Sequence, residues 1–184
     1  TGDGGLLSEI SRLLPQSEIV GSDISSKAIS LAKEKLPAKS FIVADAEHLP
    51  FRECCFDGCY SSEVIEHLFH PNKMLLNCLE VLKHGGKMVI TTPNSKTFLR
   101  EGERVRVHLH VKEYNWQELG QLFRENGFKV NTIVGIRVRF RGYGTLYRFF
   151  SWLKCKEIYL KLLQFFLGKL YPLASTLAVC AEKS

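Results

Sequence analysis

Residues 58–92, GCYSSEVIEHLFHPNKMLLNCLEVLKHGGKMVITT, decide the fold because they contain a strand, a helix and a second strand in that order. Residues 58–62, Gly-Cys-Tyr-Ser-Ser, contain no charged side chain, and we interpret them as a buried strand. Pro71 is typical of a helix N-terminus, and the apolar residues that follow it at helical spacing stop at Gly85-Gly86. Residues 87–92 predict the next strand, so this stretch is one strand–helix–strand unit.

The same alternation continues on both sides of this unit. Upstream, helical and strand patterns alternate over residues 6–14, 18–21, 25–36 and 41–44. Downstream, Asn115 with Glu118 three positions later predicts a capped helix that Gly127 ends, and strands follow over 128–136 and 173–181. Strands that alternate with helices predict an α/β fold with a doubly wound, mostly parallel, Rossmann-like sheet. At 184 residues, we expect a single domain over 1–184.

Composition indicates a reduced, cytoplasmic protein. The six cysteines form no pair of CxxC motifs, and free thiols are typical of the cytoplasm. The residues of the chain include neither a signal-peptide pattern nor a run of about 18 apolar residues that could span a membrane. We therefore expect a protein that is cytoplasmic and at most peripheral to the membrane.

The formal charge of +6 is concentrated in one segment, residues 137–169, which holds eight Lys or Arg residues against the single acid Glu157. Large aromatic and aliphatic residues alternate with these bases at a spacing that predicts an amphipathic helix or two. One interpretation is a helical insertion that caps the acceptor site and touches an anionic membrane. The alternative is that its apolar face packs on the sheet or on a second subunit. Nucleic acid is not expected as a partner, because the bases are interleaved with large apolar side chains.

Polar residues follow the predicted strands where a ligand would bind, since ligands of open α/β sheets lie outside the carboxyl ends of the strands. These residues are Gly2 before the first helix, then Asp23, Asp45 and Ser61-Ser62. Asp23 follows Gly2 at roughly the 20-residue spacing of an acid that accepts both ribose hydroxyls. A dinucleotide fingerprint would need a third glycine where this chain has Leu7, so nicotinamide chemistry is the weaker alternative.

Several stretches in the right order resemble class I S-adenosylmethionine-dependent methyltransferases, in particular methyltransferase type 11 and the ubiquinone-biosynthesis methyltransferases. Residues 1–2 are similar to the end of the family's glycine loop and residues 20–23 to its ribose-binding acid. Residues 43–46, followed by 49–51, are similar to its adenine-binding loop. The most recognisable stretches of the family are matched by residues 62–68, 79–87 and 92–94.

The resemblance implies S-adenosylmethionine as the cofactor and methyl transfer to a small aromatic, quinone-like or lipid-linked acceptor as the function. It implies that the cofactor is bound by Gly2, Asp23, Ile24, Asp45, Ala46, Ser61 and Ser62. A catalytically silent cofactor-binding protein of the same fold remains an alternative, as does a nicotinamide-dependent oxidoreductase.

The family places an apolar strand and two further glycines before the position of Thr1, and this sequence contains neither. We therefore expect the sheet to lack its first strand, which would leave the two neighbouring strands unpaired. We expect the chain from Thr1 onward to bind the cofactor weakly or not at all. Calorimetry with and without upstream residues checks this, and equal affinities would contradict it.

Methyl transfer needs few catalytic side chains, because the sulfonium donor already carries a good leaving group. His67 is the first candidate for a base that removes the acceptor's proton, and His108 and His110 are weaker candidates. On a helix, Glu63, Glu66 and His67 would share one face and could hold a divalent ion. Helix capping and charge pairing are the rival explanation, and we assign no metal to the site.

Overall fold

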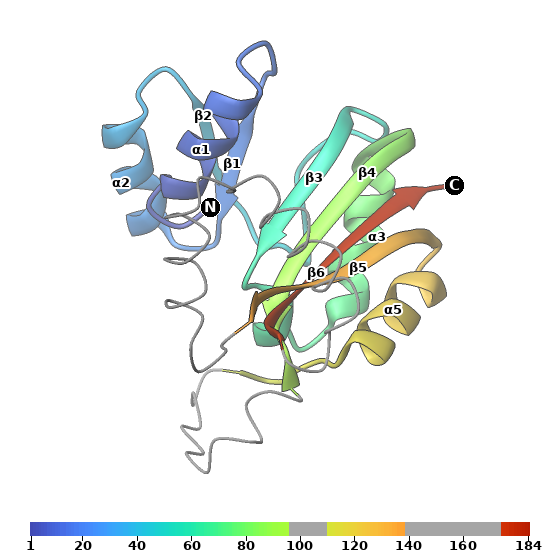
Figure 1. Cartoon of the computed structure of the whole chain (residues 1–184). Coiled ribbons are helices and arrows are strands. Elements are labelled where there is room, and N and C mark those ends of the chain that lie inside the picture. Colours follow the sequence, from blue (N-terminus) through green and yellow to red (C-terminus); the bar gives the residue numbers. More distant parts are fainter. Residues whose placement is uncertain (96–109, 139–173) are drawn as a thin grey trace, which may run out of the picture.

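The structure is a computed structural model of the chain that describes residues 1–95, 110–138 and 174–184 (Figure 1). Helices and strands alternate along the described part, as the sequence predicts. In chain order they are α1 (Gly5–Leu13), β1 (Val20–Asp23), α2 (Ser26–Lys35), β2 (Ser40–Val43), β3 (Phe56–Ser62), the 3₁₀ helix η1 (Ile65–His67), α3 (Pro71–Val81), β4 (Leu82–Pro93), α5 (Trp116–Glu125), β5 (Phe128–Val138) and β6 (Ala174–Lys183).

The strands form two sheets. β1 and β2 pair in parallel, and a four-stranded sheet has the order β3-β4-β6-β5. β3 and β4 are parallel, whereas β6 is antiparallel to both of its neighbours, so β3, β4 and β5 run in one direction and only β6 runs in the other. The prediction of an α/β fold with a mostly parallel sheet is confirmed.

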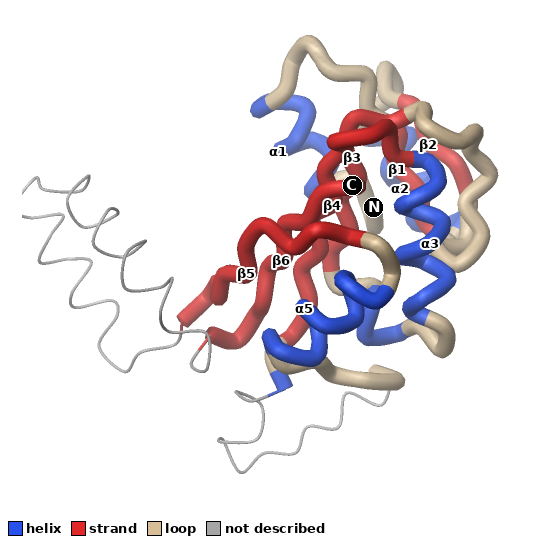
Figure 2. Tube along the Cα trace, turned by 90° about the vertical axis from the view of Figure 1, so that its right-hand side faces the viewer, coloured by secondary structure: helices blue, strands red, loops and turns tan. Residues whose placement is uncertain are grey.

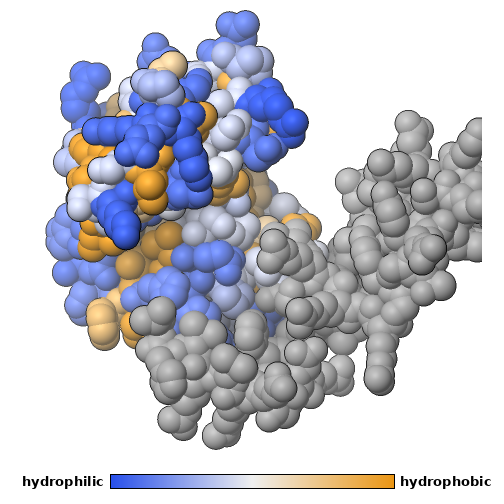
Figure 3. Space-filling view, turned by 90° about the vertical axis from the view of Figure 1, so that its left-hand side faces the viewer, coloured by the Kyte–Doolittle hydropathy of each residue, from blue (hydrophilic) through white to orange (hydrophobic). Residues whose placement is uncertain are grey.

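The division between the sheets lies between β1 and β3. Within the described ranges, β1 pairs only with β2, and β3 pairs only with β4. A sheet that lacks the strand between β1 and β3 is expected to show this pairing. Val20 on β1 and Tyr60 on β3 are partly exposed apolar side chains. On the face that carries α1 and α2, the hydrophobic surface is interrupted by hydrophilic side chains (Figure 3).

The main core lies between the four-stranded sheet and two helices. α3 and α5 cover one face of this sheet, and α1 lies on the opposite side of the strands (Figure 2). Because side chains alternate along a strand, every second residue of β4 and β6 points into this core. The buried residues are Met88, Ile90, Leu177, Val179 and Ala181 from the strands and Met74, Leu75, Cys78, Leu119 and Phe123 from the helices.

The predicted end of α3 is wrong. The apolar pattern suggested that the helix runs to Gly85-Gly86, but it ends at Val81. Leu82 adopts an extended conformation, is completely buried and pairs with Phe56 as the first residue of β4. Apolar spacing cannot separate the last turn of a helix from a buried strand that follows without a loop.

Two further expectations concern thiols and membrane spans. Cys54, Cys55, Cys59, Cys78 and Cys180 are free thiols in the structure. In the part of the chain that the structure covers, none of the helices has the length and apolar character needed to cross a bilayer. His108 and the basic aromatic segment 137–169 lie outside the described residues, except for the start of that segment on β5.

The predicted capping box at the start of α5 is confirmed and permits a stability test. Asn115 Oδ1 accepts hydrogen bonds from the backbone amides of Gln117 and Glu118, and the Glu118 carboxylate accepts one from the Asn115 amide. Asn115→Ala is expected to destabilise the protein by about 1 kcal/mol and to lower Tm by about 2–4 °C in calorimetry. Asn115→Asp retains the acceptor and serves as the control. An unchanged Tm for the alanine variant would contradict the assignment.

Candidate functional site

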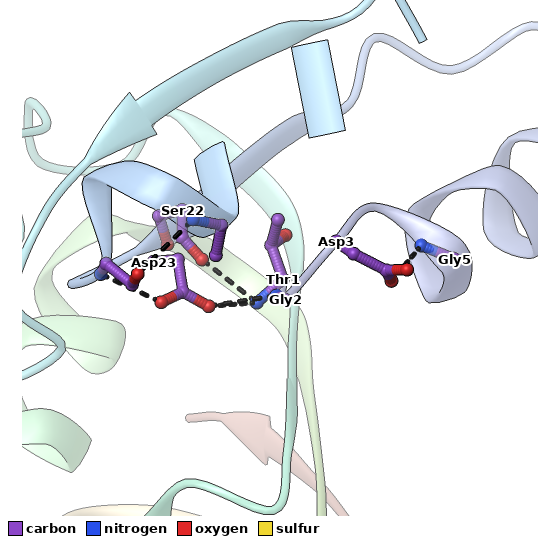
Figure 4. A network of polar contacts seen from close by, with 8 residues as sticks. Thr1, Gly2, Asp3, Gly5, Ser22 and Asp23 are labelled. Atoms are coloured by element: carbon purple, nitrogen blue, oxygen red, sulfur yellow. Dashed lines mark hydrogen bonds and ion pairs between the residues drawn. The ribbon is translucent and has the colours of Figure 1, made fainter. Parts of the chain in front are cut away.

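Asp23 and Gly2 form the centre of a polar network at the end of β1 (Figure 4). The amide of Gly2 donates to Asp23 Oδ2 at 2.8 Å, and the amide of Ser25 donates to Oδ1 at 3.0 Å. The α-amino group of Thr1 also lies 3.3 Å from Oδ2. The structure therefore brings together the two residues that the sequence pairs by spacing alone.

The Asp23 carboxylate is held in its ionised form. Burial by itself would raise its pKa, but the pKa lies below the usual value, chiefly because of the hydrogen bonds from the amides of Ser25 and Gly2. A depressed pKa in the folded state means that the charge contributes stability above roughly pH 4, which is lost as the pH falls through the folded value. At neutral pH, Asp23 is a pure hydrogen-bond acceptor.

The surroundings of Asp23 fit a ribose. Its side chain keeps 22% of its surface exposed, so lone pairs that the amides leave free can accept hydroxyl hydrogens. Gly2 has φ +55°, and a Cβ built on it would meet no atom within 4 Å, so the backbone has open space beside it. Ile24, the next predicted binding residue, exposes its apolar side chain. A nucleoside could therefore approach the backbone here without steric conflict.

The loop after β2 is held in place by a residue that the sequence analysis missed. Asp45 Oδ1 accepts from the Glu47 amide at 2.8 Å, and Ala46 packs against the core. Asn77 on α3 accepts from the Leu49 amide at 3.2 Å and donates to the Glu47 carbonyl at 2.9 Å. Asn77 thus positions the Asp45 loop. A half-buried amide on a helix gives no sequence signal of this role.

Close packing behind Asp23 yields a second stability test. A Cβ at Gly21 of β1 would lie 2.7 Å from Phe41 Cδ1 and 2.8 Å from Leu7 Cδ1, which is too close for carbon atoms. Gly21→Ala is therefore expected to cost about 1–3 kcal/mol, measured by urea unfolding.

A matched control for this test lies on β3. A Cβ at Gly58 would approach nothing nearer than the Lys87 carbonyl oxygen at 3.5 Å, an ordinary contact. Gly58→Ala is therefore expected to leave stability unchanged or to raise it by up to about 1 kcal/mol. If both variants lost the same free energy of unfolding, the close packing of Phe41 against Gly21 would not be the cause of the loss.

The end of β3 carries Ser61, Ser62 and a strained residue. Ser62 Oγ accepts from Thr91 Oγ1 at 2.9 Å, which holds the hydroxyl against β4. Glu63 follows with φ +52°, a conformation uncommon for residues other than glycine, and its amide donates to the Thr91 carbonyl. Such strain is concentrated at functional sites.

The prediction that Glu63, Glu66 and His67 share a helical face is wrong. The positive φ of Glu63 places it before η1, which covers only Ile65–His67. The structure instead groups Glu66 and His67 with His110, whose donor atoms lie within 4.8 Å of one another. Among the described residues, this is the set whose spacing suits a divalent ion.

Several contacts hold Glu66 and His67 of this group at the end of β4. The completely buried Glu66 accepts a hydrogen bond from Thr92 Oγ1 at 2.8 Å through Oε2. His67 keeps 40% of its side chain exposed, and its Nε2 lies 3.9 Å from Glu66 Oε1. The sequence analysis did not anticipate that Glu66 and Thr92 are partners, because they lie on different elements.

Comparison with known proteins places the first half of the chain in a described family. Residues 1–90 match the model of a methyltransferase domain family. A demethylmenaquinone methyltransferase from Thermotoga maritima is 36% identical over 101 residues, 53% of this chain and 44% of the relative. The mitochondrial ubiquinone biosynthesis O-methyltransferase of Mus musculus is 30% identical over 72% of this chain and 41% of its own length. The chain spans less than half the length of these two relatives.

Solved structures share the fold at lower identity. An S-adenosylmethionine-dependent methyltransferase from Mesorhizobium loti superposes with a TM-score of 0.71 at 16% identity, covering 99% of this chain and 87% of that chain. Phosphoethanolamine N-methyltransferase 2 from Haemonchus contortus, in complex with S-adenosyl-L-methionine, gives 0.69 at 21% identity and covers 99% and 46%. These likenesses show that the chain shares the Rossmann-like α/β fold of these structures.

Proposed function

We propose that the protein transfers a methyl group from S-adenosylmethionine to a small acceptor, because residues 1–90 of this chain belong to the methyltransferase domain family. The observation that carries the proposal is the ionised Asp23 beside the open backbone at Gly2. The family match supplies the reaction type. We use the name crevice for the proposed cofactor site, which supplies a place for the nucleoside and consists of Gly2, Asp23, Ile24, Asp45, Ala46, Ser61 and Ser62. The hydrogen bond from Asn77 to the Glu47 carbonyl holds the loop after β2, which carries the Asp45 side of this crevice.

The residues of the crevice would hold the donor rather than react with it. Asp23 accepts the ribose hydroxyls, and the open space at Gly2 admits the methionine part. Asp45 and Ala46 face the adenine, next to the exposed Ile24, and Ser61 with Ser62 line the methionine side. When bound, S-adenosylmethionine supplies an electrophilic methyl group on a positively charged sulfur. The contribution of the protein is therefore to orient the reactants and exclude water.

His67 would take the proton of a hydroxyl acceptor. Its ring is partly exposed, so an acceptor can reach it, and the buried Glu66 carboxylate lies 3.9 Å from its Nε2. A carboxylate beside an imidazole compensates the positive charge that the ring gains with the proton. His67 is the proposed catalytic residue of the described part of the chain.

A small aromatic, quinone-like or lipid-linked molecule is the proposed acceptor class. Relatives whose names refer to menaquinone and ubiquinone biosynthesis support this choice. The exposed ring of Phe69, two residues after His67, offers an apolar contact for such a molecule.

Two measurements test the proposal. Calorimetry with the longest natural form of the chain should detect S-adenosylhomocysteine binding and no comparable binding of NAD. Incubation with radiolabelled S-adenosylmethionine and 3,4-dihydroxybenzoate, a demethylated naphthoquinol or a bacterial lipid extract should then label one acceptor. Tight NAD binding would indicate an oxidoreductase. Cofactor binding without any labelling of these acceptors would indicate a silent binding protein.

We further propose that the protein is cytoplasmic and contacts an anionic membrane through residues 137–169. The eight bases and interleaved aromatic residues of this segment support the contact, since each base near such a surface contributes about 1 kcal/mol. Sedimentation with anionic liposomes at moderate salt tests it. A protein that stays in the supernatant would favour packing of the segment on the sheet or on a second subunit.

A further inference from the structure

Four titratable side chains from two distant segments meet beside the end of β4. Glu66 and His67 belong to η1, whereas His110 and Glu113 belong to the segment that precedes α5. The rings of His67 and His110 meet edge to face, with centroids 4.9 Å apart and planes at 69°. We call these two residues the histidine pair. A carboxylate lies near each ring, Glu66 near His67 and Glu113 near His110.

Glu66 determines which nitrogen of the His67 ring should carry a proton. Its Oε1 is buried and has no hydrogen-bond partner among the described residues, while Oε2 is bonded to Thr92. A buried carboxylate oxygen without compensation is costly, and His67 Nε2 lies 3.9 Å from it. A proton on this nitrogen offsets the cost, so Glu66 favours the ring orientation with Nε2 toward the core.

Glu113 determines the state of the second ring. Its Oε1 lies 3.2 Å from His110 Nδ1, and an ionised carboxylate can only accept a hydrogen bond. His110 therefore carries a proton on Nδ1, and in the neutral ring Nε2 remains without one. Only 13% of the His110 side chain is exposed, so this ring has few alternative positions.

The backbone locks the two segments together. The carbonyl oxygen of Glu66 accepts hydrogen bonds from the amides of Val111 at 2.8 Å and Lys112 at 3.1 Å. The Lys112 ammonium lies 5.0 Å from the centre of the Tyr114 ring. Burial, together with the negative charges of Glu118 and Glu66, raises the pKa of Tyr114. The ring of His110 is thereby placed against His67 by the same contacts that anchor Glu66.

We propose that His110 is a positioning residue for His67, and that Glu113 holds His110 in the orientation this requires. This inference rests on the proposed function, in which His67 removes the acceptor's proton. The proton would then move from the acceptor hydroxyl to the His67 ring. The oxygen electron pair would form a bond to the methyl carbon as the carbon–sulfur bond of the donor breaks and leaves S-adenosylhomocysteine, and Glu66 would compensate the imidazolium. The exposed part of the His67 ring later returns the proton to water. An edge-to-face contact of this kind is a favoured arrangement of two rings and therefore restricts the orientation of the His67 ring.

Nuclear magnetic resonance of the longest natural form of the chain, bound to S-adenosylhomocysteine, tests the positioning without turnover. With ¹⁵N- and ¹³C-labelled histidine, His110 should show the Nδ1–H tautomer, and Glu113→Gln should populate the other one. The order parameter of the His67 ring should fall from about 0.85 toward 0.6 in His110→Ala. His110→Phe keeps a ring and should give an intermediate value. His84→Phe, which alters an exposed histidine on β4, should change nothing.

Kinetics with whichever acceptor is labelled supplies the second readout. His110→Ala should lower kcat about tenfold, while KM and the Kd for S-adenosylhomocysteine stay within about twofold. A rigid His67 ring in His110→Ala would overturn the inference, as would an equal fall in cofactor affinity for both His110 variants. Stoichiometric Co²⁺ binding with a visible absorption band that His110→Ala abolishes would also overturn it, because the cluster would then be a metal site. Failure of every acceptor with the ring results intact would reject the proposed function and not the positioning of His67.

Discussion

Asp23→Asn is expected to weaken S-adenosylhomocysteine binding by about a hundredfold in calorimetry. Hydrogen bonds to a charged group contribute about 1.5–3 kcal/mol each, and two ribose hydroxyls would share this carboxylate. The substitution also damages the loop, because an amide nitrogen cannot accept the hydrogen bond that Gly2 or Ser25 now donates. Both effects act in the same direction.

A control on an exposed aspartate separates this effect from a general change in charge. Asp57 is mostly exposed, pairs with Lys83 and lies at the beginning of β3, at the opposite end of that strand from the crevice. Asp57→Asn should leave the Kd within about twofold. A Kd for Asp23→Asn within threefold of the unmodified protein would contradict the role of Asp23 in the crevice.

Phe123→Ala should cause the largest loss of stability, about 3–5 kcal/mol. Phe123 of α5 is completely buried, and its ring centroid lies 5.5 Å from that of Phe128. Removal of the ring leaves a cavity between α5 and β5 that rigid neighbours cannot fill. For a domain of this size, Tm should fall by roughly 6–20 °C in differential scanning calorimetry.

Phe69 provides the matched control because it is the same residue type with 78% of its surface exposed. Phe69→Ala should change the free energy of unfolding by no more than about 0.5 kcal/mol. If both variants unfolded at the same temperature, the core assignment of α5 would be wrong.

The order of helices and strands was predictable because it depends on local periodicity. The capping box of α5 and the turn at Gly127 follow from residues that are neighbours in sequence, and the structure shows both, with φ +85° at Gly127. The grouping of Gly2 with Asp23 was also predictable, since the ends of neighbouring elements in this class of sheet meet at one edge.

The chemistry around His67 was less predictable because it depends on contacts between distant segments. Nothing local in Glu66 reveals that its carbonyl oxygen binds Val111 and Lys112 and thereby places His110 next to His67. The helical spacing of Glu63 with His67 suggested a different set, and a single positive φ at Glu63 was enough to invalidate it. Local patterns identify residue types, whereas tertiary contacts decide which of them meet.

The division of the strands into two sheets makes the crevice a composite of two half-sites. Asp23 ends β1 and Asp45 follows β2, whereas Ser62 ends β3 and Glu66 and His67 follow it. In the proposed reaction, a methyl donor bound at the first half-site would have to lie next to an acceptor at His67 in the second half-site. Asn77 bridges them, because it sits on α3 and binds the loop that follows β2. In the proposed methyl transfer, the alignment of donor and acceptor would therefore depend on contacts between the two sheets, and a change at Asn77 would alter it without touching either reactant.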